Sequence, residues 1–399
     1  MKRITLIITL ALAAFSFGSC ISVDDLKPET PVYQPEEEPE EQPDEQPEDR
    51  PDEDQDDGYE QDKDKPLASS ATDLASAGKT ANCYIVSSAG TYKFKPVKGN
   101  SSTSVGSVSS VEVLWESFGT SVTPSVGDLI DAVNYDAGYV VFSTPSSFKK
   151  GNAVIAAKDA SGEILWSWHI WLTDQPREQV YANNAGTMMD RNLGAISATP
   201  GDVGALGLLY QWGRKDPFLG SSSIGSEVEA KSTGTWPSAV VSSSSTGTIE
   251  YAVRNPMTFI AQNTYNRDWY YTSSHTKDNT RWQSNKSIYD PCPVGWRVPD
   301  GGNNGVWAVA GFDNQLFDNV DNGMLFINQS TPSTWYPLTV FRFSDGVEFK
   351  MLDGEIASGY WALGLPVASC FLFKKDGSVY SSIYGESNAC GLPVRCLQE

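Results

Sequence analysis

The residue types that most often perform acid–base and metal chemistry are scarce in this chain of 399 residues. There are two histidines, His169 and His275, so a histidine-dependent catalytic triad or a multi-histidine metal site has little material. The sequence also lacks a P-loop, a Gly-x-Gly-x-x-Gly turn, a His-Glu-x-x-His helix and a Cys-x-x-Cys pair. We therefore expect no enzymatic activity, no metal and no cofactor.

Three isolated groups that could do chemistry are interpreted as structural. His169 has no acidic, Cys or His partner at a recognisable spacing, so we expect a packed histidine rather than a ligand or base. Cys83 lies in a predicted strand, which favours a buried free thiol. The acidic run 318–323 does not match the ligand order of a calcium-binding EF-hand loop, so we expect a turn there.

Aromatic and hydrogen-bonding side chains are concentrated between residues 266 and 282. Such a mixture suits stacking on a sugar or contact with a protein. The candidate ligand-binding residues are Arg267, Asp268, Trp269, Tyr270, Tyr271, His275 and Trp282. Because large aromatic side chains are more often buried in a core, that alternative stays open. The serine-rich stretch 221–248 is expected to be a long surface loop.

Cysteine usage favours export to an oxidising compartment. Four of the five cysteines after Cys20 lie in the last 110 or so residues, and four cysteines allow three disulfide pairings, among which the spacing does not choose. The alternative is that all four are reduced and buried. The four are Cys292, Cys370, Cys390 and Cys396.

The N-terminus is typical of an export signal, predicted over residues 1–19. Two basic residues precede an apolar run over 4–17, which is short for a membrane span. Gly18 and Ser19 before Cys20 resemble the bacterial lipobox, in which the cysteine thiol is acylated after the leader is removed. The resemblance predicts a lipoprotein, palmitate included, anchored at Cys20. An ordinary signal peptide with an incidental Cys20 is the alternative.

Residues 20–66 have the composition of a disordered acidic tether. Between 24 and 65 there are 20 acidic and 4 basic residues, and proline recurs at every fourth position from 31 to 51. Asp24 and Asp25 resemble the acidic signal that sends Bacteroidetes lipoproteins to the cell surface. A generic solvated charge run is the alternative. The rest of the chain is only mildly acidic, and no basic stripe suggests nucleic-acid binding.

Residues 67–178 are predicted to form an immunoglobulin-like β-sandwich. Large apolar residues alternate over 164–171, which indicates a strand, and Asp159 to Gly162 join it to a strand over 153–157 as a hairpin. Further short strands are expected over 82–86, 91–95, 111–116 and 138–143.

The remaining residues, 179–399, contain several motifs in order. They are Met189-Asp190-Arg191-Asn192-Leu193-Gly194-Ala195, Gly207-Leu208-Leu209-Tyr210-Gln211-Trp212-Gly213-Arg214-Lys215-Asp216-Pro217-Phe218, Tyr289-Asp290-Pro291-Cys292-Pro293-Val294-Gly295-Trp296-Arg297-Val298-Pro299 and Gly391-Leu392-Pro393-Val394-Arg395-Cys396. Together they resemble the Fibrobacter succinogenes major paralogous domain family, whose members occur on surface lipoproteins and fimbrial tips of Bacteroidetes.

The resemblance implies an α+β, C-type-lectin-like domain without an established enzymatic activity. It also implies a disulfide between Cys292 and Cys396, which leaves Cys370 with Cys390. The glycine-rich insertion 300–305 departs from the family pattern and predicts a short or displaced first helix. Strands are expected over 323–328, 335–343, 347–351 and 370–373, with turns at 344–346 and 375–377. The tripeptides with which sugar-binding C-type lectins hold calcium are absent from the folded region, so calcium-dependent glycan binding does not carry over.

We therefore expect a mainly β, non-enzymatic binding protein, displayed at the cell surface as an outer-membrane lipoprotein. Adhesion, or a subunit similar to those at fimbrial tips, is the leading function. A glycan-capturing lipoprotein of a polysaccharide-uptake system is the alternative, and a hydrolase with an unrecognised site is a third. The expected partners are the lipid anchor and fimbrial subunits, a surface protein of host or bacterium, or a glycan.

Overall fold

The computed structural model describes residues 65–399 apart from 76, 266, 275, 279, 313–314, 328–332, 348, 351–356, 365–367 and 385–386. The described residues belong to one compact unit. The leader, Cys20, Asp24, Asp25 and nearly all of the acidic segment lie outside the described residues, so the predictions on them are not tested by the fold. No helix in the described part of the chain is both long enough and apolar enough to span a bilayer.

Strand β8 (Ile164–Leu172) shows how residue alternation organises the first sheets. Successive side chains of a strand point to opposite faces. Trp166, Trp168 and Ile170 pack in the core between two sheets, as the alternation predicts. The opposite face, which includes Ser167 and Trp171, is buried as well. Strand β8 is therefore covered on both sides.

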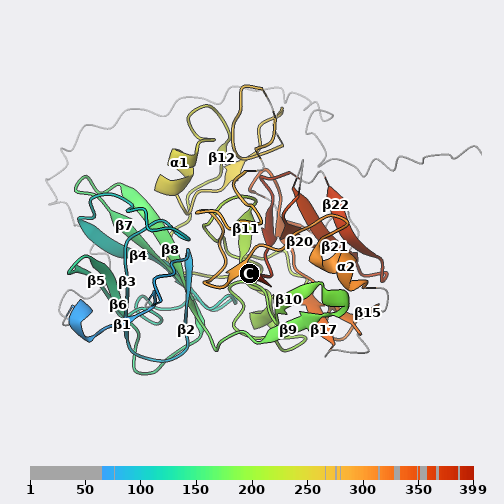
Figure 1. Ribbon diagram of the computed structural model, residues 1–399, viewed down its shortest axis with the longest axis horizontal. Helices are drawn as coiled ribbons and strands as arrows, with labels where there is room; N and C mark the ends of the chain where they lie inside the picture. The colour runs from blue at the N-terminus through green and yellow to red at the C-terminus, as the bar shows by residue number, and fades with distance from the viewer. Residues whose placement is uncertain are drawn as a thin grey trace, which may run out of the picture. The chain divides into compact units, whose positions relative to one another are not determined.

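Two four-stranded sheets share the core that contains Trp168, and Figure 1 shows them at the blue-green end of the chain. One has the order β2-β8-β7-β4 and the other β1-β3-β6-β5. Strand β2 runs parallel to β8, and β1 runs parallel to β3. The other strands are β1 (Thr72–Asp73), β2 (Cys83–Val86), β3 (Thr91–Phe94), β4 (Ser110–Ser117), β5 (Ala132–Asp136), β6 (Tyr139–Ser143) and β7 (Gly151–Lys158).

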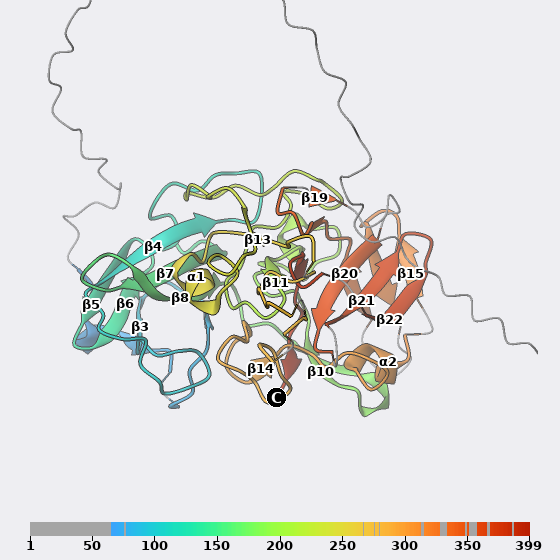
Figure 2. The same ribbon diagram turned by 90° about the horizontal axis from the view of Figure 1, so that it is seen from above.

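The second part of the chain has shorter strands in several small sheets, of which β20, β21 and β22 lie side by side in Figure 2. The sheet orders are β14-β24-β10-β9, β11-β23-β18-β19, β15-β16-β17, β20-β21-β22 and β12-β13. Their bounds are β9 (Glu178–Tyr181), β10 (Gly186–Met189), β11 (Leu209–Gln211), β12 (Val240–Val241), β13 (Ile260–Ala261), β14 (Trp296–Arg297), β15 (Gln315–Asp318), β16 (Gly323–Phe326), β17 (Thr334–Pro337), β18 (Phe341–Arg342), β19 (Phe349–Lys350), β20 (Ala357–Ala362), β21 (Ser369–Lys374), β22 (Val379–Tyr384), β23 (Gly391–Pro393) and β24 (Leu397–Gln398).

Helices are short and few among the described residues. The α-helices are α1 (Ile249–Arg254) and α2 (Val306–Ala310), and single 3-10 turns occur at Ala68–Ser70, Ala182–Asn184 and Val203–Ala205. Helix α2 follows the glycine-rich insertion and has only five residues, as the glycines predict. Gly305 offers no side-chain cap at its start, and Gly311 ends it with a φ of 63°.

A hydrophobic cluster crosses the predicted boundary between residues 178 and 179. Trp115 and Trp171 from the first sheets share this cluster with Tyr210 and Trp361 from the second part. Trp171 also donates its indole N–H to the carbonyl of Ala195 at 3.0 Å. The two predicted domains are thus in continuous apolar contact, and residues 67–178 and 179–399 remain predicted divisions.

Most predicted strands form, and the mainly β class is confirmed. The hairpin turn at 159–162 and the turns at 346 and 377 are also formed. The single strand predicted over 335–343 is divided into β17 and β18. Strands β1, β5, β9 to β15, β20 and β22 to β24 are not among those predicted. Strand β20 is buried along its whole length and has no polar alternation, so its sequence lacks the usual pattern of a half-buried strand.

Candidate functional site: a tyrosine surface on a buried frame

The two tryptophans proposed as stacking faces are buried. Trp269 and Trp282 each expose 1% of their surface. Trp269 donates its indole N–H to the carbonyl of Trp212 at 2.8 Å, and Trp282 donates to the carbonyl of Tyr289 at 2.9 Å. The expectation that they lie on an exposed surface is therefore wrong. Each is a core residue, and its polar edge is satisfied by a main-chain acceptor.

Asp268 and Arg281 form a buried ion pair that holds the same segment. Nη2 of Arg281 lies 2.6 Å from Oδ2 of Asp268, and neither side chain exposes more than 2%. Asn388 donates to the same carboxylate oxygen at 2.8 Å. The guanidinium lies 4.4 Å from the centre of the Trp269 ring. A buried carboxylate with these partners is positioned to hold the fold and not to contact a ligand.

The remaining candidates in this segment reach solvent. Arg267 is exposed, and Tyr270 and Tyr271 are half-buried. Two further tyrosines are added to them: Tyr265, which is 74% exposed and lies two positions before Arg267 in the sequence, and the half-buried Tyr251 of α1, which packs against the same cluster as Tyr270. We call these five residues, Tyr251, Tyr265, Arg267, Tyr270 and Tyr271, the tyrosine surface. His275 lies outside the described residues.

One small hydrophobic cluster supports two members of the tyrosine surface. Tyr251 and Tyr270 both pack against a cluster that includes Ile260 and Trp269. Because the hydrogen bond and the Arg281 guanidinium hold the Trp269 ring in place, the cluster gives Tyr251 and Tyr270 a rigid support. The tyrosine rings are therefore held on one side and open on the other.

Helix α1 and the turn before it hold Tyr251 and Tyr271. The hydroxyl of Thr248 accepts a hydrogen bond from the backbone N–H of Tyr251 at 3.0 Å, which caps the helix. The N–H of Tyr271 donates to the carbonyl of Gly247 at 2.8 Å. A Cβ atom at Gly247 would lie 2.8 Å from Cβ of Tyr271, so this close approach requires glycine.

The stretch 221–248 contains more buried structure than the expected surface loop. Ala230 and Ser242 are buried, and the ring of Trp236 packs against those of Trp115 and Phe218. Serine content alone did not reveal these anchors.

His169 is buried at the interface between strand β8 and the second part of the chain. Its Nε2 lies 2.9 Å from Oδ1 of Asn152, whose amide donates to the carbonyl of Gly194. Since that amide oxygen accepts, Nε2 carries the proton. Burial lowers the pKa of His169 to about 3, so the ring is neutral. The packed histidine expected from the sequence is confirmed.

A buried serine–lysine–aspartate cluster lies on the same face of β8. Nζ of Lys215 lies 2.6 Å from Oγ of Ser167 and also contacts Asp216, which accepts a 2.7 Å hydrogen bond from the same serine. Burial lowers the pKa of Lys215. The three side chains are at most 6% exposed, so a substrate has no route to the hydroxyl. This cluster joins the two parts of the chain.

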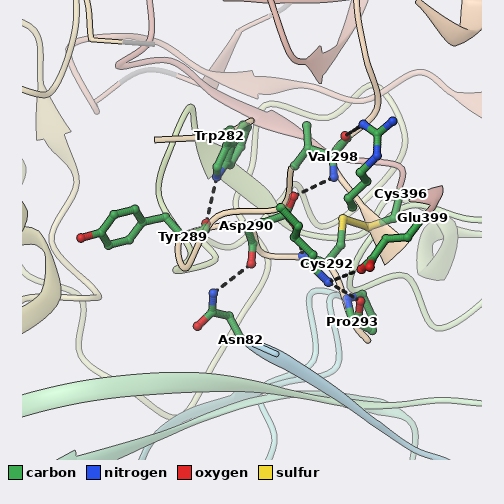
Figure 3. The surroundings of a disulfide bond; sticks show 11 residues. Asn82, Trp282, Tyr289, Asp290, Cys292, Pro293, Val298, Cys396 and Glu399 are labelled. Carbon is green, nitrogen blue, oxygen red and sulfur yellow. Dashed lines mark hydrogen bonds and ion pairs between the residues drawn. A yellow bond between two sulfur atoms is a disulfide. The ribbon is translucent and has the colours of Figure 1, made fainter. Parts of the chain in front are cut away.

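The disulfide between Cys292 and Cys396 forms as the family resemblance implies. Figure 3 shows Asp290 beside it, with its side chain turned toward Val298. The carboxylate accepts from the backbone N–H groups of Cys292 (2.9 Å) and Val298 (3.0 Å). Burial nevertheless raises the pKa of Asp290 to about 6, because Lys286 and other nearby groups only partly offset desolvation.

The predictions for the other three cysteines of the fold were confirmed for one and not for the other two. Cys83 is a buried free thiol, as predicted, and burial raises its pKa far above the usual value. Cys370 and Cys390 belong to one hydrophobic cluster, but the structure contains no disulfide between them. The pairing of Cys370 with Cys390 was predicted only because these two cysteines were left after Cys292 was paired with Cys396. A disulfide needs a specific Cα separation and orientation, and a pairing by exclusion does not provide them.

Metal-ligand clusters are absent from the part of the chain that the structure describes. The acidic run 318–323 is the turn that the sequence predicts. Oδ1 of Asp318 accepts from the backbone N–H groups of Val320 and Asp321, and the turn joins β15 to β16. No protein-family description, curated protein or solved structure matched this chain in comparison. The tyrosine surface therefore stands on its geometry alone.

Proposed function

We propose that the chain is a surface-anchored, non-enzymatic binding protein that serves adhesion, alone or as a fimbrial-tip-like subunit. In this proposal Cys20 bears the lipid anchor in the outer membrane, and residues 20–66 form the tether. Residues 67–178 form an immunoglobulin-like support, and residues 179–399 form a lectin-like domain that presents the binding site outwards.

One observation supports this proposal most directly: the tyrosine surface is built on a buried frame. The side chains of Asp268 and Arg281 are fully enclosed, and Trp269 is fixed between main chain and guanidinium. The neighbouring Tyr270 and Tyr271 are left half-open beside the exposed Arg267. A rigid frame lowers the entropy lost when exposed side chains bind a partner.

Tyrosine rings combine a flat apolar face with a polar hydroxyl, so they suit contact with a protein and stacking on a sugar. The five residues reach the surface from two segments, helix α1 and the stretch 265–271. Surfaces of this composition are typical of recognition sites that combine aromatic anchors with an arginine. The glycan-capturing alternative uses the same surface and differs only in its ligand.

The first test is a ligand screen with matched variants of the full chain. We expect Tyr270→Ala and Tyr271→Ala each to weaken binding to the captured protein or glycan by about tenfold, which is roughly 1.4 kcal/mol. Tyr139→Ala, a half-buried tyrosine of β6, is the control and should bind like the wild type. Protein hits favour adhesion, and carbohydrate hits favour uptake. Equal binding by all four proteins would contradict the assigned surface.

The second test concerns the anchor. We expect Cys20→Ala to leave the detergent-rich phase for the aqueous phase, because the thiol is needed for acylation. Replacing Asp24 and Asp25 with Ala should retain membrane association and reduce cleavage by protease added to intact cells. A Cys20→Ala protein that still partitions into detergent would refute the lipoprotein assignment.

A further inference from the structure

Burial changes abruptly just before the chain enters strand β2. Of the described residues between 65 and 80, Pro66 and Ala68 are buried and the others are half-buried or exposed. The next four residues expose 3% or less of their surface: Ala81, Asn82, Cys83 and Tyr84. The entry segment, residues 65–80, is therefore much less embedded than the chain that follows it.

Polar contacts at the rim of the second sheet retain the entry segment. The backbone N–H of Ala68 donates to Asp136 at 2.8 Å, and its carbonyl accepts from Lys93 at 2.7 Å. Strand β1 adds two residues of parallel pairing with β3. Hydrogen bonds that are partly open to water contribute little net stability, and among the described residues of this segment only Leu74 packs against the core between the sheets, so the segment can detach while most of that core stays intact.

Asn82 is held far more tightly than the entry segment. Its amide donates to the carbonyls of Ile288 (2.7 Å) and Asp290 (2.9 Å), and its oxygen accepts from the indole N–H of Trp166 (3.0 Å). Figure 3 shows its side chain beside Asp290. A Cβ atom at Gly99 would lie 2.3 Å from Oδ1 of Asn82, so glycine makes room for this side chain.

Strand β2, which begins directly after Asn82, pairs with β8 in parallel over four residues. The first residue of β2 and the last residue of β8 lie at opposite ends of this pair. A pulling force that is applied at the start of β2 and at the end of β8 acts along the two strands. Such a force loads all of the hydrogen bonds between the strands at the same time rather than one after another. A parallel pair that is pulled in this way thus resists a higher force than a strand pair that is pulled apart from one end.

We propose that the entry segment and Asn82 form a two-stage mechanical latch. Under tension from the N-terminal side, residues 65–80 detach first and lengthen the connection. The extension then stops at Asn82, where the load passes into β2 and the loop 287–290. This inference rests on the proposed function in one respect, namely that the anchor lies on the N-terminal side of the fold.

The loop 287–290, which Asn82 holds, lies close in the sequence to Arg281 in the frame of the tyrosine surface. The loop that Asn82 holds follows Trp282, whose indole N–H donates to the carbonyl of Tyr289. Two residues after Asp290, Cys292 is bonded to Cys396 near the end of the described chain. A ligand that pulls on the tyrosine surface is therefore opposed through a short path of buried contacts. The first stage absorbs load without disturbing that path.

Single-molecule pulling on the chain from residue 20 to residue 399, with Cys20→Ser and handles at both ends, tests the latch without any ligand. We expect an early extension by about 16 residues, roughly 50 Å of chain, followed by the main unfolding event at higher force. Lys93→Ala should accelerate the early step only. Asn82→Ala should accelerate the main event at constant force by about tenfold, since it removes buried hydrogen bonds.

Asn100→Gly is the matched control. The side-chain amide of Asn100 donates to the carbonyl of Ser287 at 2.7 Å, in the same loop, and Asn100 lies beyond β2 in the sequence. Its backbone N–H bond to the carbonyl of Thr80 is kept in the variant. Its φ of 56° is readily adopted by glycine, so the variant should change the rate of the main event by less than about twofold. If Asn82→Ala does not fold, Gly99→Ala displaces the same side chain and should act in the same direction.

Two outcomes would overturn the latch: release of residues 65–80 in one event with the rest of the fold, or an Asn82→Ala variant with the main event unchanged. Neither outcome bears on ligand binding or acylation. Conversely, if the tyrosine surface does not bind a ligand, or if Cys20 carries no lipid, the two events in the pulling experiment are still expected. The two proposals can therefore fail separately.

Discussion

The core between the two four-stranded sheets is packed with apolar side chains, among them Phe94, Ile155 and Trp168. After residue 190, by contrast, the buried interior includes many charged side chains. These are Arg191, Arg214, Lys215, Asp216, Asp268, Arg281, Asp290 and Arg395. The sandwich core thus depends mainly on the removal of apolar surface from water, whereas the second part depends also on matched charges and hydrogen bonds.

Short strands and long connections explain this difference. A long connection contains main-chain carbonyls that no sheet partner satisfies, and a buried arginine can donate to several of them. Arg214 donates to the carbonyl of Thr258, in the connection between α1 and β13, at 2.8 Å. Arg395 donates at 3.1 Å to the carbonyl of Trp335 in β17, which lies at the edge of its sheet. We therefore expect substitutions in the apolar core to lower the free energy of unfolding in small steps. Removal of one partner of a buried polar pair should lower it by a large amount at once.

The largest expected effect is at the buried ion pair. Asp268→Ala leaves the Arg281 charge enclosed without its carboxylate and should cost about 3–5 kcal/mol of unfolding free energy. Denaturant titration measures it. The double variant Asp268→Leu/Arg281→Met should recover much of that loss, because no unpaired charge remains. A double variant as unstable as the sum of the single ones would show that the pair is not coupled.

An intermediate effect is expected at Asp290, whose folded pKa is raised to about 6 from 3.8. The folded state then binds the proton of Asp290 more tightly than the unfolded state, so the contribution of this carboxyl to stability is complete at low pH and is lost as pH rises from about 4 to about 6. The loss is on the order of 2–3 kcal/mol, and Asp290→Asn should flatten that part of the curve. Glu116, whose pKa is also raised by burial, will leave some slope. An unchanged curve would remove Asp290 from this role.

The smallest effect is expected in the apolar core. Ile155→Val deletes one methylene group from a fully buried side chain and should cost about 1 kcal/mol. Its midpoint should shift in the same direction at pH 4 and pH 7, because no titratable group is involved. A loss as large as that of Asp268→Ala would contradict the contrast between graded and abrupt behaviour.

Much of the first part of the chain could be predicted because its pattern is local. Alternation over 164–171 placed β8, and the residues Asp159 to Gly162 placed the turn before it. The short helix α2 followed from the glycines at 301–305. For the candidate site, the position along the chain was found, together with three of the five residues of the tyrosine surface. Tyr251 and Tyr265 were missed, since they lie outside the dense aromatic run.

The sequence by itself determined the alternation of β8, the mainly β class and the polar or apolar character of each segment, because these depend on neighbours along the chain. Tertiary structure alone decided which aromatic residues are exposed. Trp269 is enclosed because the carbonyl of Trp212, 57 positions away, and the guanidinium of Arg281 meet it there. Ser167 is buried because Lys215 and Asp216 cover it. Burial depends on which distant segment packs against a side chain, and local residue types do not contain that information.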